Sequence, residues 1–261
     1  MPVAATVALA YAGTVAAFTA VWLRQLKTAN AGMIDPVWAA MLGVVALLAA
    51  ALGPGAAANR AFVGIAGGAW GLRLAAHLWQ RNRGRPEDAR YRQLRAQWSA
   101  GRMFAFFQLQ AVISMLLSVA FFVPAGQAAP ASAVRLAGAA AVWLAAVAGE
   151  TLSDRALRRF AADPANRGEV CRAGPWRYSR HPNYFFECLH WIAYPVLALG
   201  GPWGWLTLAP PLLMAWLLLK ISGIPPLEAH LAATRPGYRD YMRTTSVLVP
   251  WPPKRPAAPT R

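Results

Sequence analysis

The chain has 261 residues, of which 57% are hydrophobic and 14% are charged, and its formal net charge is +16. It contains no GxGxxG or GxxxxGK loop, which excludes a Rossmann or P-loop nucleotide domain. Its two cysteines form no CxxC motif, so neither a disulfide framework nor a cysteine metal site is predicted.

Seven stretches of the sequence are apolar and close to the roughly 20 residues that a helix needs to cross a bilayer core. We therefore predict an all-α integral membrane bundle of seven transmembrane helices, forming a single domain over residues 1–253. The tail, residues 254–261, is rich in proline and is predicted to be disordered. In chain order the seven segments are residues 3–23, 36–52, 61–79, 103–123, 134–152, 184–200 and 203–222.

The positive charges are sorted by connection. Of the 26 Lys and Arg residues, 22 lie in residues 24–35, 80–102, 153–183 and 223–261, and the alternate connections hold only Arg60 and Arg135. By the positive-inside rule this places the N-terminus outside and the C-terminus in the cytoplasm. Orientation and attraction to membrane lipids account for the charge, so no nucleic-acid partner is predicted. The arginine-rich, alanine-rich composition hints at a bacterial inner membrane.

Several polar side chains lie at or near the ends of apolar segments, at helical spacing. A charge at bilayer depth costs about 2.5–3.5 kcal/mol on insertion scales, so such groups face a cavity, pair or take part in chemistry. We expect a shared polar cavity open to the cytoplasm, with interhelical salt bridges as the alternative. The residues concerned are Asp35, Arg73, His77, Glu150, Asp154, Arg158, Asn183, Glu187 and His190.

The stretch "GPWRYSRHPNYFFECLHW", residues 174–191, changes from a basic loop to an apolar segment. Pro182 favours the first turn of a helix, so the sixth helix is predicted to begin there. Its free backbone N–H groups, with Arg172, Arg177 and Arg180 just upstream, would suit a phosphate or a carboxylate. A surface patch for lipid headgroups is the alternative interpretation.

The motif "RYSRHPNYFFE", residues 177–187, resembles the signature of the membrane steroid 5α-reductase-like family. Other blocks follow in that family's order: "MIDPVW", "WGLRLAAHL", "NRGRPEDARY", "ETLSDRALRRF", "SGIPPLEAHL" and "RPGYRDYMRTTSVLVP". The resemblance implies an NADPH-dependent enzyme that reduces a carbon–carbon double bond conjugated to a ketone, as in a Δ4-3-keto steroid. It further implies a hydrophobic substrate that enters from the lipid.

Some of these elements also resemble the isoprenylcysteine carboxyl methyltransferases, which use S-adenosylmethionine. The shared elements are the Arg-His-Pro core and a later Glu with Tyr-x-x-Tyr, here Glu228, Tyr238 and Tyr241. Asn183 and Glu187 favour the reductases. A binding or scaffold protein that has lost its chemistry is a third hypothesis.

The reductase resemblance assigns roles to individual positions. It implies that Asn183 and Glu187 hold the nicotinamide carboxamide, that Asp154 and Glu150 lie near the adenosine ribose, and that Arg83 and Arg85 form a phosphate-binding loop. Further positions are predicted to complete the NADPH site: Arg158, Arg172, Arg177, Tyr178, Arg180, His181, Glu228, Tyr238 and Tyr241.

For the substrate carbonyl, the family uses a carboxylate on the second helix and a tyrosine on the third. Asp35 is at about the first position and is predicted to act through a protonated carboxyl. The third segment has no tyrosine, so Trp70, Arg73, His77 or Tyr184 is considered as the second donor, with Arg73 and Tyr184 as the catalytic candidates. Two further departures are Phe186, where the family usually has glycine, and Ala161, where a basic residue is common.

Overall fold

The computed structural model of the chain describes residues 2–84 and 86–254. The tail predicted to be disordered therefore lies, from residue 255 on, outside the described residues, as does Arg85. Within the described residues every regular element is helical, apart from one isolated parallel bridge between Ser179 and Ser246. The predicted all-α class is confirmed.

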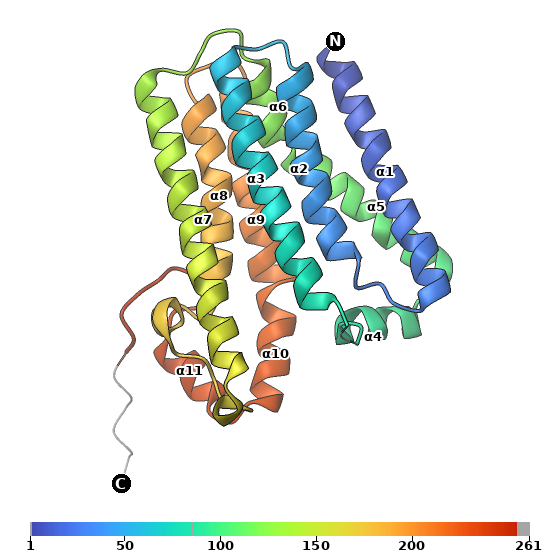
Figure 1. Cartoon of the computed structure of the whole chain (residues 1–261), viewed down its shortest axis with the longest axis vertical. Helices are drawn as coiled ribbons and strands as arrows, with labels where there is room; N and C mark the ends of the chain where they lie inside the picture. Colours follow the sequence, from blue (N-terminus) through green and yellow to red (C-terminus); the bar gives the residue numbers. More distant parts are fainter. Residues whose placement is uncertain (1, 85, 255–261) are drawn as a thin grey trace. The chain divides into compact units, whose positions relative to one another are not determined.

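Figure 1 shows the helices in chain order. Their bounds are α1 (Val3–Thr28), α2 (Ile34–Leu52), α3 (Ala57–Asn82), α4 (Ala89–Gln97), α5 (Ala100–Leu117), α6 (Val119–Gly126), α7 (Ala133–Ala162), α8 (Pro182–Ala198), α9 (Ala209–Trp216), α10 (Ile224–Thr234) and α11 (Tyr238–Thr244), with short 3₁₀ turns at Pro164–Asn166, Gly174–Arg177 and Gly204–Leu208 and a π-helical turn at Leu217–Ile221.

Six helical stretches among the described residues are long and apolar enough to cross a membrane: Val3–Thr28, Ile34–Leu52, Ala57–Asn82, Ala100–Gly126, Ala133–Ala162 and Gly204–Thr234. The segment predicted at residues 184–200 is α8, which has 17 residues and is not one of the six. Large apolar side chains in these spans are exposed, such as Ile65 at 67% and Leu72 at 73% on α3. Exposed apolar side chains of this kind are expected where a helix faces lipid. The protein is therefore an all-helical membrane protein.

The chain forms two compact units. Unit 1 comprises residues 1–137 and 194–210, and unit 2 comprises residues 138–193 and 211–261.

In unit 1, α2 and α3 run side by side at very close range (Figure 1). A Cβ atom on Gly71 would lie 2.6 Å from the Cα atom of Gly43, and one on Gly67 would lie 2.4 Å from the Cβ atom of Ala46. Small residues at such a seam let two helix backbones approach, which is how helices associate in a bilayer.

A second set of contacts in unit 1 joins α1 to α5. Their shared core consists of buried Phe18, Val21, Met103, Phe107 and Ala111, and it continues to Ile34 and Tyr91. Tyr91 on α4 is thereby held next to the start of α2.

The loops at the other end of these helices are tied by hydrogen bonds. Arg60 donates from Nε to Ala50 O at 2.6 Å and from Nη2 to Ala51 O at 3.0 Å, which satisfies the free carbonyls at the end of α2. The amide of buried Gln127 donates to Ala198 O at 3.0 Å. Arg60 therefore has a structural role, which explains why a basic residue lies in a connection that holds few of them.

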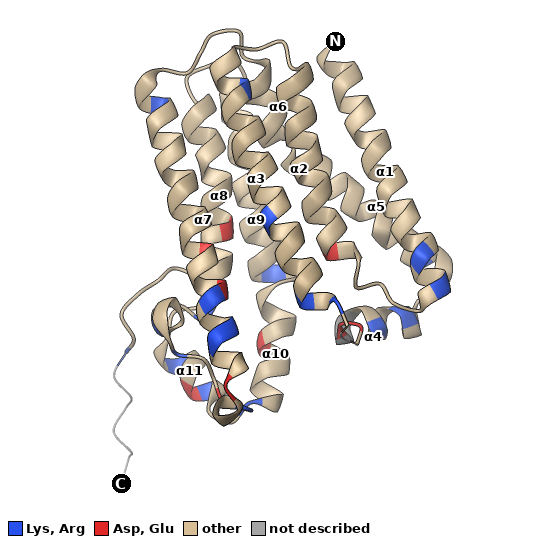
Figure 2. Cartoon of the chain, viewed as in Figure 1, with Lys and Arg blue, Asp and Glu red and all other residues tan. Residues whose placement is uncertain are grey.

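In each unit the charged residues gather at particular helix ends (Figure 2). In unit 1 they lie at the ends of α1 and α3 and on α4, and in unit 2 they lie on the last turns of α7 and on α11. The middles of the spans are nearly free of charge.

In unit 2, Gly149 of α7 packs directly against Phe186 of α8. A Cβ atom on Gly149 would lie 2.2 Å from the Phe186 ring. The bulky Phe186, which departs from the resemblance, is thus accommodated by a glycine on the facing helix.

Candidate functional site

The Arg-His-Pro segment of unit 2 folds as the sequence predicts. Gly174–Arg177 is a 3₁₀ turn, and α8 begins at Pro182. The Trp176 indole donates to Ser153 O at 2.9 Å, which fastens the turn to α7. From α11, the Tyr241 hydroxyl bonds to Trp176 O, and to Ser179 O at 3.0 Å. The loop is therefore held from two elements far apart in sequence.

Arg180 forms a clamp with the C-terminal part of unit 2. Its Nε donates to Glu228 Oε1 at 2.6 Å and its Nη2 to Glu228 Oε2 at 3.3 Å. Its Nη1 donates to Met242 O at 2.9 Å and to Thr245 O at 2.6 Å. Four hydrogen bonds of the guanidinium thus go to protein acceptors. We call Arg180, Glu228, Met242 and Thr245 the Arg180 clamp.

His181 shares the same carboxylate. Its side chain is 2% exposed, and its Nε2 lies 2.9 Å from Glu228 Oε1. The imidazole stacks on Tyr184, with the ring centroids 5.5 Å apart and the planes 10° from parallel. Glu228 therefore orients both the arginine and the histidine of the motif.

A cavity of about 730 Å³ opens beside the clamp, which we call the unit-2 cavity. That volume lies within the range of about 300–1,000 Å³ typical of small-molecule sites. Its walls come from the end of α7, the loop of residues 163–171, α10 and α11. They combine apolar Leu157, Phe160, Ala161, Leu227 and Leu231 with polar Arg167, Arg180, His181, Arg235, Tyr238 and Tyr241.

Two tyrosines and a cysteine in this wall are kept protonated. Burial raises the pKa of Tyr238 and Tyr241 well above the usual range, and the two rings pack edge to face with centroids 5.8 Å apart. Burial also raises the pKa of the Cys171 thiol. The thiolate is the nucleophilic form, so burial lowers the reactivity of Cys171.

The other arginines predicted for phosphate binding lie outside the cavity wall. Arg172, Arg177 and Arg158 are exposed. The guanidinium carbon of Arg172 lies 5.3 Å from the Tyr241 ring centroid, and that of Arg177 lies 6.0 Å from the ring of Tyr178. They are available to a charged ligand at the surface of unit 2.

The acidic and amide positions predicted for the cofactor lie on α7 and α8 and do not line the cavity. Glu150 and Asp154, one turn apart on α7, are 4% and 6% exposed. Glu187 is 7% exposed and accepts a hydrogen bond at 3.0 Å from the Trp191 indole. Asn183 is partly buried in the first turn of α8. Of the elements that also resemble the methyltransferases, the cavity wall thus contains Arg180, His181, Tyr238 and Tyr241 but not Glu228, and the positions that favour a reductase lie apart from the wall.

In unit 1, Asp35 has a partner that the sequence analysis missed. The Tyr91 hydroxyl donates to Asp35 Oδ1 at 2.5 Å, and Arg81 Nη2 lies 3.9 Å from Asp35 Oδ2. Tyr91 is 8% exposed. It belongs to the "NRGRPEDARY" block, which lies outside the third apolar segment and is not among the positions predicted for the second donor.

Three of the four residues predicted as substitutes for that phenol lie on α3, and the fourth, Tyr184, lies on α8. Trp70 is fully buried and packs edge-on against Trp38, with centroids 6.3 Å apart. Arg73 and His77 are partly buried. Tyr184 belongs to unit 2 and stacks on His181, as described above.

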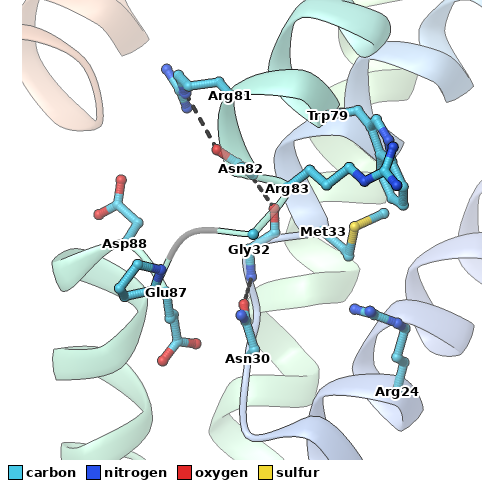
Figure 3. A pocket seen from close by; sticks show the side chains of 12 residues that line it. Arg24, Asn30, Gly32, Met33, Trp79, Arg81, Asn82, Arg83, Glu87 and Asp88 are labelled. Carbon is cyan, nitrogen blue, oxygen red and sulfur yellow. Dashed lines mark hydrogen bonds between the residues drawn. The ribbon is translucent and has the colours of Figure 1, made fainter.

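A second pocket, of about 360 Å³, lies in unit 1 where α1 and α3 end (Figure 3). We call it the Arg83 pocket. It is lined by Arg24, Asn30, Gly32, Met33, Trp79, Arg81, Asn82, Arg83, Gly84, Pro86, Glu87 and Asp88. Of the predicted phosphate loop, Arg83 therefore faces a pocket, and Arg85 lies outside the described residues. In the described ranges, no three His, Cys, Asp or Glu side chains are grouped to hold a metal ion.

The family model described as "Protein of unknown function (DUF1295)" matches residues 21–245. The chain belongs to the DUF1295 family. The matched range contains the Arg180 clamp, the unit-2 cavity and the Asp35–Tyr91 pair, so all three lie in the DUF1295 region. No match was found among curated proteins or among solved structures.

Proposed function

We propose that the protein is an NADPH-dependent reductase of a carbon–carbon double bond conjugated to a carbonyl, acting on a hydrophobic enone such as a Δ4-3-keto steroid. The observation that carries the proposal is the hydrogen bond from Tyr91 to Asp35. The reductase resemblance requires a carboxyl group and a phenol to bind the substrate carbonyl. Asp35 on α2 would supply the carboxyl group, and Tyr91 would supply the phenol from α4, where the resemblance does not predict it.

The pair suits the charge that develops during such a reduction. In such a reduction hydride from NADPH would add to the β-carbon and negative charge would build on the carbonyl oxygen, until a proton from water added to the α-carbon. A preorganised O–H donor at that oxygen typically lowers the barrier by about 3–4 kcal/mol. Tyr91 is buried against the α1–α5 core, which holds its ring in place. With Asp35 protonated, the carboxyl would donate to the Tyr91 oxygen and the single Tyr91 O–H would be directed to the substrate carbonyl.

For the cofactor, the proposal draws on unit 2. Its cavity has the size of an organic ligand site, and Tyr238 and Tyr241 line it with neutral side chains. The Tyr241 hydroxyl is already bonded to Trp176 O and Ser179 O. Arg158, Arg172 and Arg177 would bind phosphates, Asn183 and Glu187 the carboxamide, and Glu150 and Asp154 the ribose. Arg180, His181 and Glu228 would act by shaping the loop, because their polar atoms are used within the protein.

For topology, we propose seven spans, with the N-terminus outside, the C-terminus in the cytoplasm and the cofactor side facing the cytoplasm of a bacterial inner membrane. The seventh span is α8, whose 17 residues are at the short end of what crosses a bilayer core. Support for the orientation comes from the alternation of basic connections along the chain.

A methyltransferase using S-adenosylmethionine is the second candidate. It is favoured by the composition of the unit-2 cavity, whose wall contains Arg180, His181, Tyr238 and Tyr241 but not Asn183 or Glu187.

The test begins with mass spectrometry of nucleotides retained by the full chain purified in mild detergent. Bound NADP(H) supports the reductase, and bound S-adenosylmethionine or its product supports the methyltransferase. NADPH oxidation is then measured against a panel of enones for the wild type and the Tyr91→Phe variant.

We expect Tyr91→Phe to lower kcat about 100-fold or more, as loss of one oxyanion donor does. Tyr11→Phe is the matched control, because Tyr11 is an exposed tyrosine of unit 1. Asp35→Asn should change both turnover and its pH dependence. Enone reduction by Tyr91→Phe at the wild-type rate would show that the pair does not bind the carbonyl, and bound NADPH without turnover of any enone would exclude this substrate class.

A further inference from the structure

The Arg83 pocket of unit 1 presents two guanidinium groups that the protein itself does not use. Within residues 2–84 and 86–254, the side chains of Arg24 and Arg83 make no hydrogen bond or ion pair with another residue. Both line the pocket, and Figure 3 shows both on its Met33 side. Two cations at one small pocket repel each other unless an anion lies between them.

The walls of this pocket are fixed by hydrogen bonds. Asn82 Nδ2 donates to Gly32 O at 2.8 Å, and the Gly32 N–H donates to Asn30 Oδ1 at 2.7 Å (Figure 3). These bonds join the loop between α1 and α2 to the end of α3. The pocket is thus held open by the fold, so binding would require little ordering of the backbone.

The carboxylates of the lining do not neutralise the two arginines. Glu87 accepts the Ala31 N–H at 2.7 Å and pairs with Arg95 at 2.8 Å. In Figure 3, Glu87 and Asp88 lie on the opposite side of the pocket from Arg24 and Arg83. The Met33 side therefore keeps a net positive charge.

Exposed apolar side chains flank the same arginines. On α1, Leu23 and Leu26 are each 50% exposed, and Trp79 of α3 is 44% exposed. Both helices are long and apolar enough to span a membrane. A ligand with an anionic head and hydrocarbon chains would match the arginines and these side chains together, and basic pockets at the ends of membrane helices bind such headgroups.

We propose that Arg24 and Arg83 bind the phosphate of an anionic phospholipid headgroup in the Arg83 pocket. Its volume of about 360 Å³ is near the lower end for ligand sites and suits a headgroup better than a dinucleotide. The inference does not rest on the proposed reductase function. It assigns Arg83 to a lipid, where the resemblance assigns it to a cofactor.

The test uses the full chain in detergent micelles doped with phosphatidylglycerol or phosphatidylcholine, with retained lipid counted by native mass spectrometry. Arg24→Gln and Arg83→Gln should each weaken retention of phosphatidylglycerol about tenfold, the effect of losing one charge-assisted hydrogen bond. Arg102→Gln is the matched control, because Arg102 is exposed in the same unit and does not line the pocket. Arg24→Lys should retain part of the binding.

The retention of the two lipids and the displacement of bound phosphatidylglycerol decide the proposal. Equal retention of both lipids, or an equal loss in the Arg102→Gln control, would overturn the proposal. Displacement of phosphatidylglycerol by millimolar NADPH, but not by millimolar inorganic phosphate, would assign the pocket to the nucleotide instead. If Arg83→Gln fails to fold, Arg24→Gln decides alone, because Arg24 is exposed on α1 and makes no side-chain contact on which the described fold depends.

Discussion

Replacing Arg180 by methionine removes the four hydrogen bonds of the Arg180 clamp and leaves the Glu228 carboxylate without its main partner. The side chains of Arg180 and Glu228 are only 10% and 11% exposed, so water compensates little. Removing one partner of such a buried pair typically costs about 3–5 kcal/mol. At 1.36 kcal/mol per factor of ten, even the lower figure raises the opened population about 150-fold.

Hydrogen exchange measured by mass spectrometry on the protein in detergent follows this opening directly, because amide exchange reports the population of locally unfolded states. Peptides covering α11 and residues 245–251 should exchange about two orders of magnitude faster in Arg180→Met, with α1 to α3 unchanged. The double variant Arg180→Met, Glu228→Leu should recover most of the protection, since an apolar pair can replace a buried ion pair.

The matched control is Arg243→Met on α11. Arg243 pairs with Asp240, but their side chains are 77% and 61% exposed, so its loss should have almost no effect. If Arg180→Met exchanged at the wild-type rate, or if Arg243→Met were equally damaging, the clamp would not be what holds this segment.

Three further predictions concern packing and ionisation. Gly149→Ala should destabilise the protein by about 1–3 kcal/mol through overpacking against Phe186, and Phe186→Ala in the same chain should relieve it, which thermal unfolding in detergent would measure. Gly71→Ala should destabilise the protein by a similar amount, because its Cβ atom would meet the α2 backbone. Gly13→Ala should not, because nothing lies within 4 Å of its Cβ position. Equal melting temperatures of the two variants would contradict the close packing of α2 against α3. Tyr241→Phe should cost about 1–3 kcal/mol at neutral pH through its lost hydrogen bonds. Burial raises the pKa of Tyr241, so its contribution to the free energy of unfolding is complete below the unfolded-state pKa of about 10 and is lost as the pH rises through the folded-state pKa. In alkaline unfolding curves, the stability difference between the wild type and Tyr241→Phe should therefore shrink above about pH 10.

Local features of the fold could be predicted from the sequence. Pro182 marks the start of α8 because proline fits the first turn of a helix, and the long apolar segments locate the spans. The segment predicted at residues 103–123 is found as α5 and α6, with a break at Ser118 that its composition does not reveal. The last span continues through a π-helical turn into α10, well past its predicted end at residue 222.

Pairings between distant residues could not be predicted in this way. Arg180 and Glu228 are 48 residues apart, and Asp35 and Tyr91 are 56 apart, so neither pair leaves a periodic pattern. The charge of Arg180 predicts a phosphate ligand, whereas the carbonyls that accept its hydrogen bonds depend on where α11 lies. Phe186 stood out as too large for its position, and only the facing Gly149 explains it.

The bridge between Ser179 and Ser246 also has a consequence for biosynthesis. Arg180 N–H bonds to Ser246 O at 2.8 Å, the Ser179 hydroxyl to Leu248 O at 2.7 Å, and the Trp251 N–H to Tyr178 O at 2.9 Å. The loop before α8 thus leaves the ribosome about 70 residues before its hydrogen-bonding partners. During that interval the nascent chain holds polar backbone groups open at the membrane surface, and a stop codon shortly before residue 246 would leave the spans inserted but the loop without its anchor.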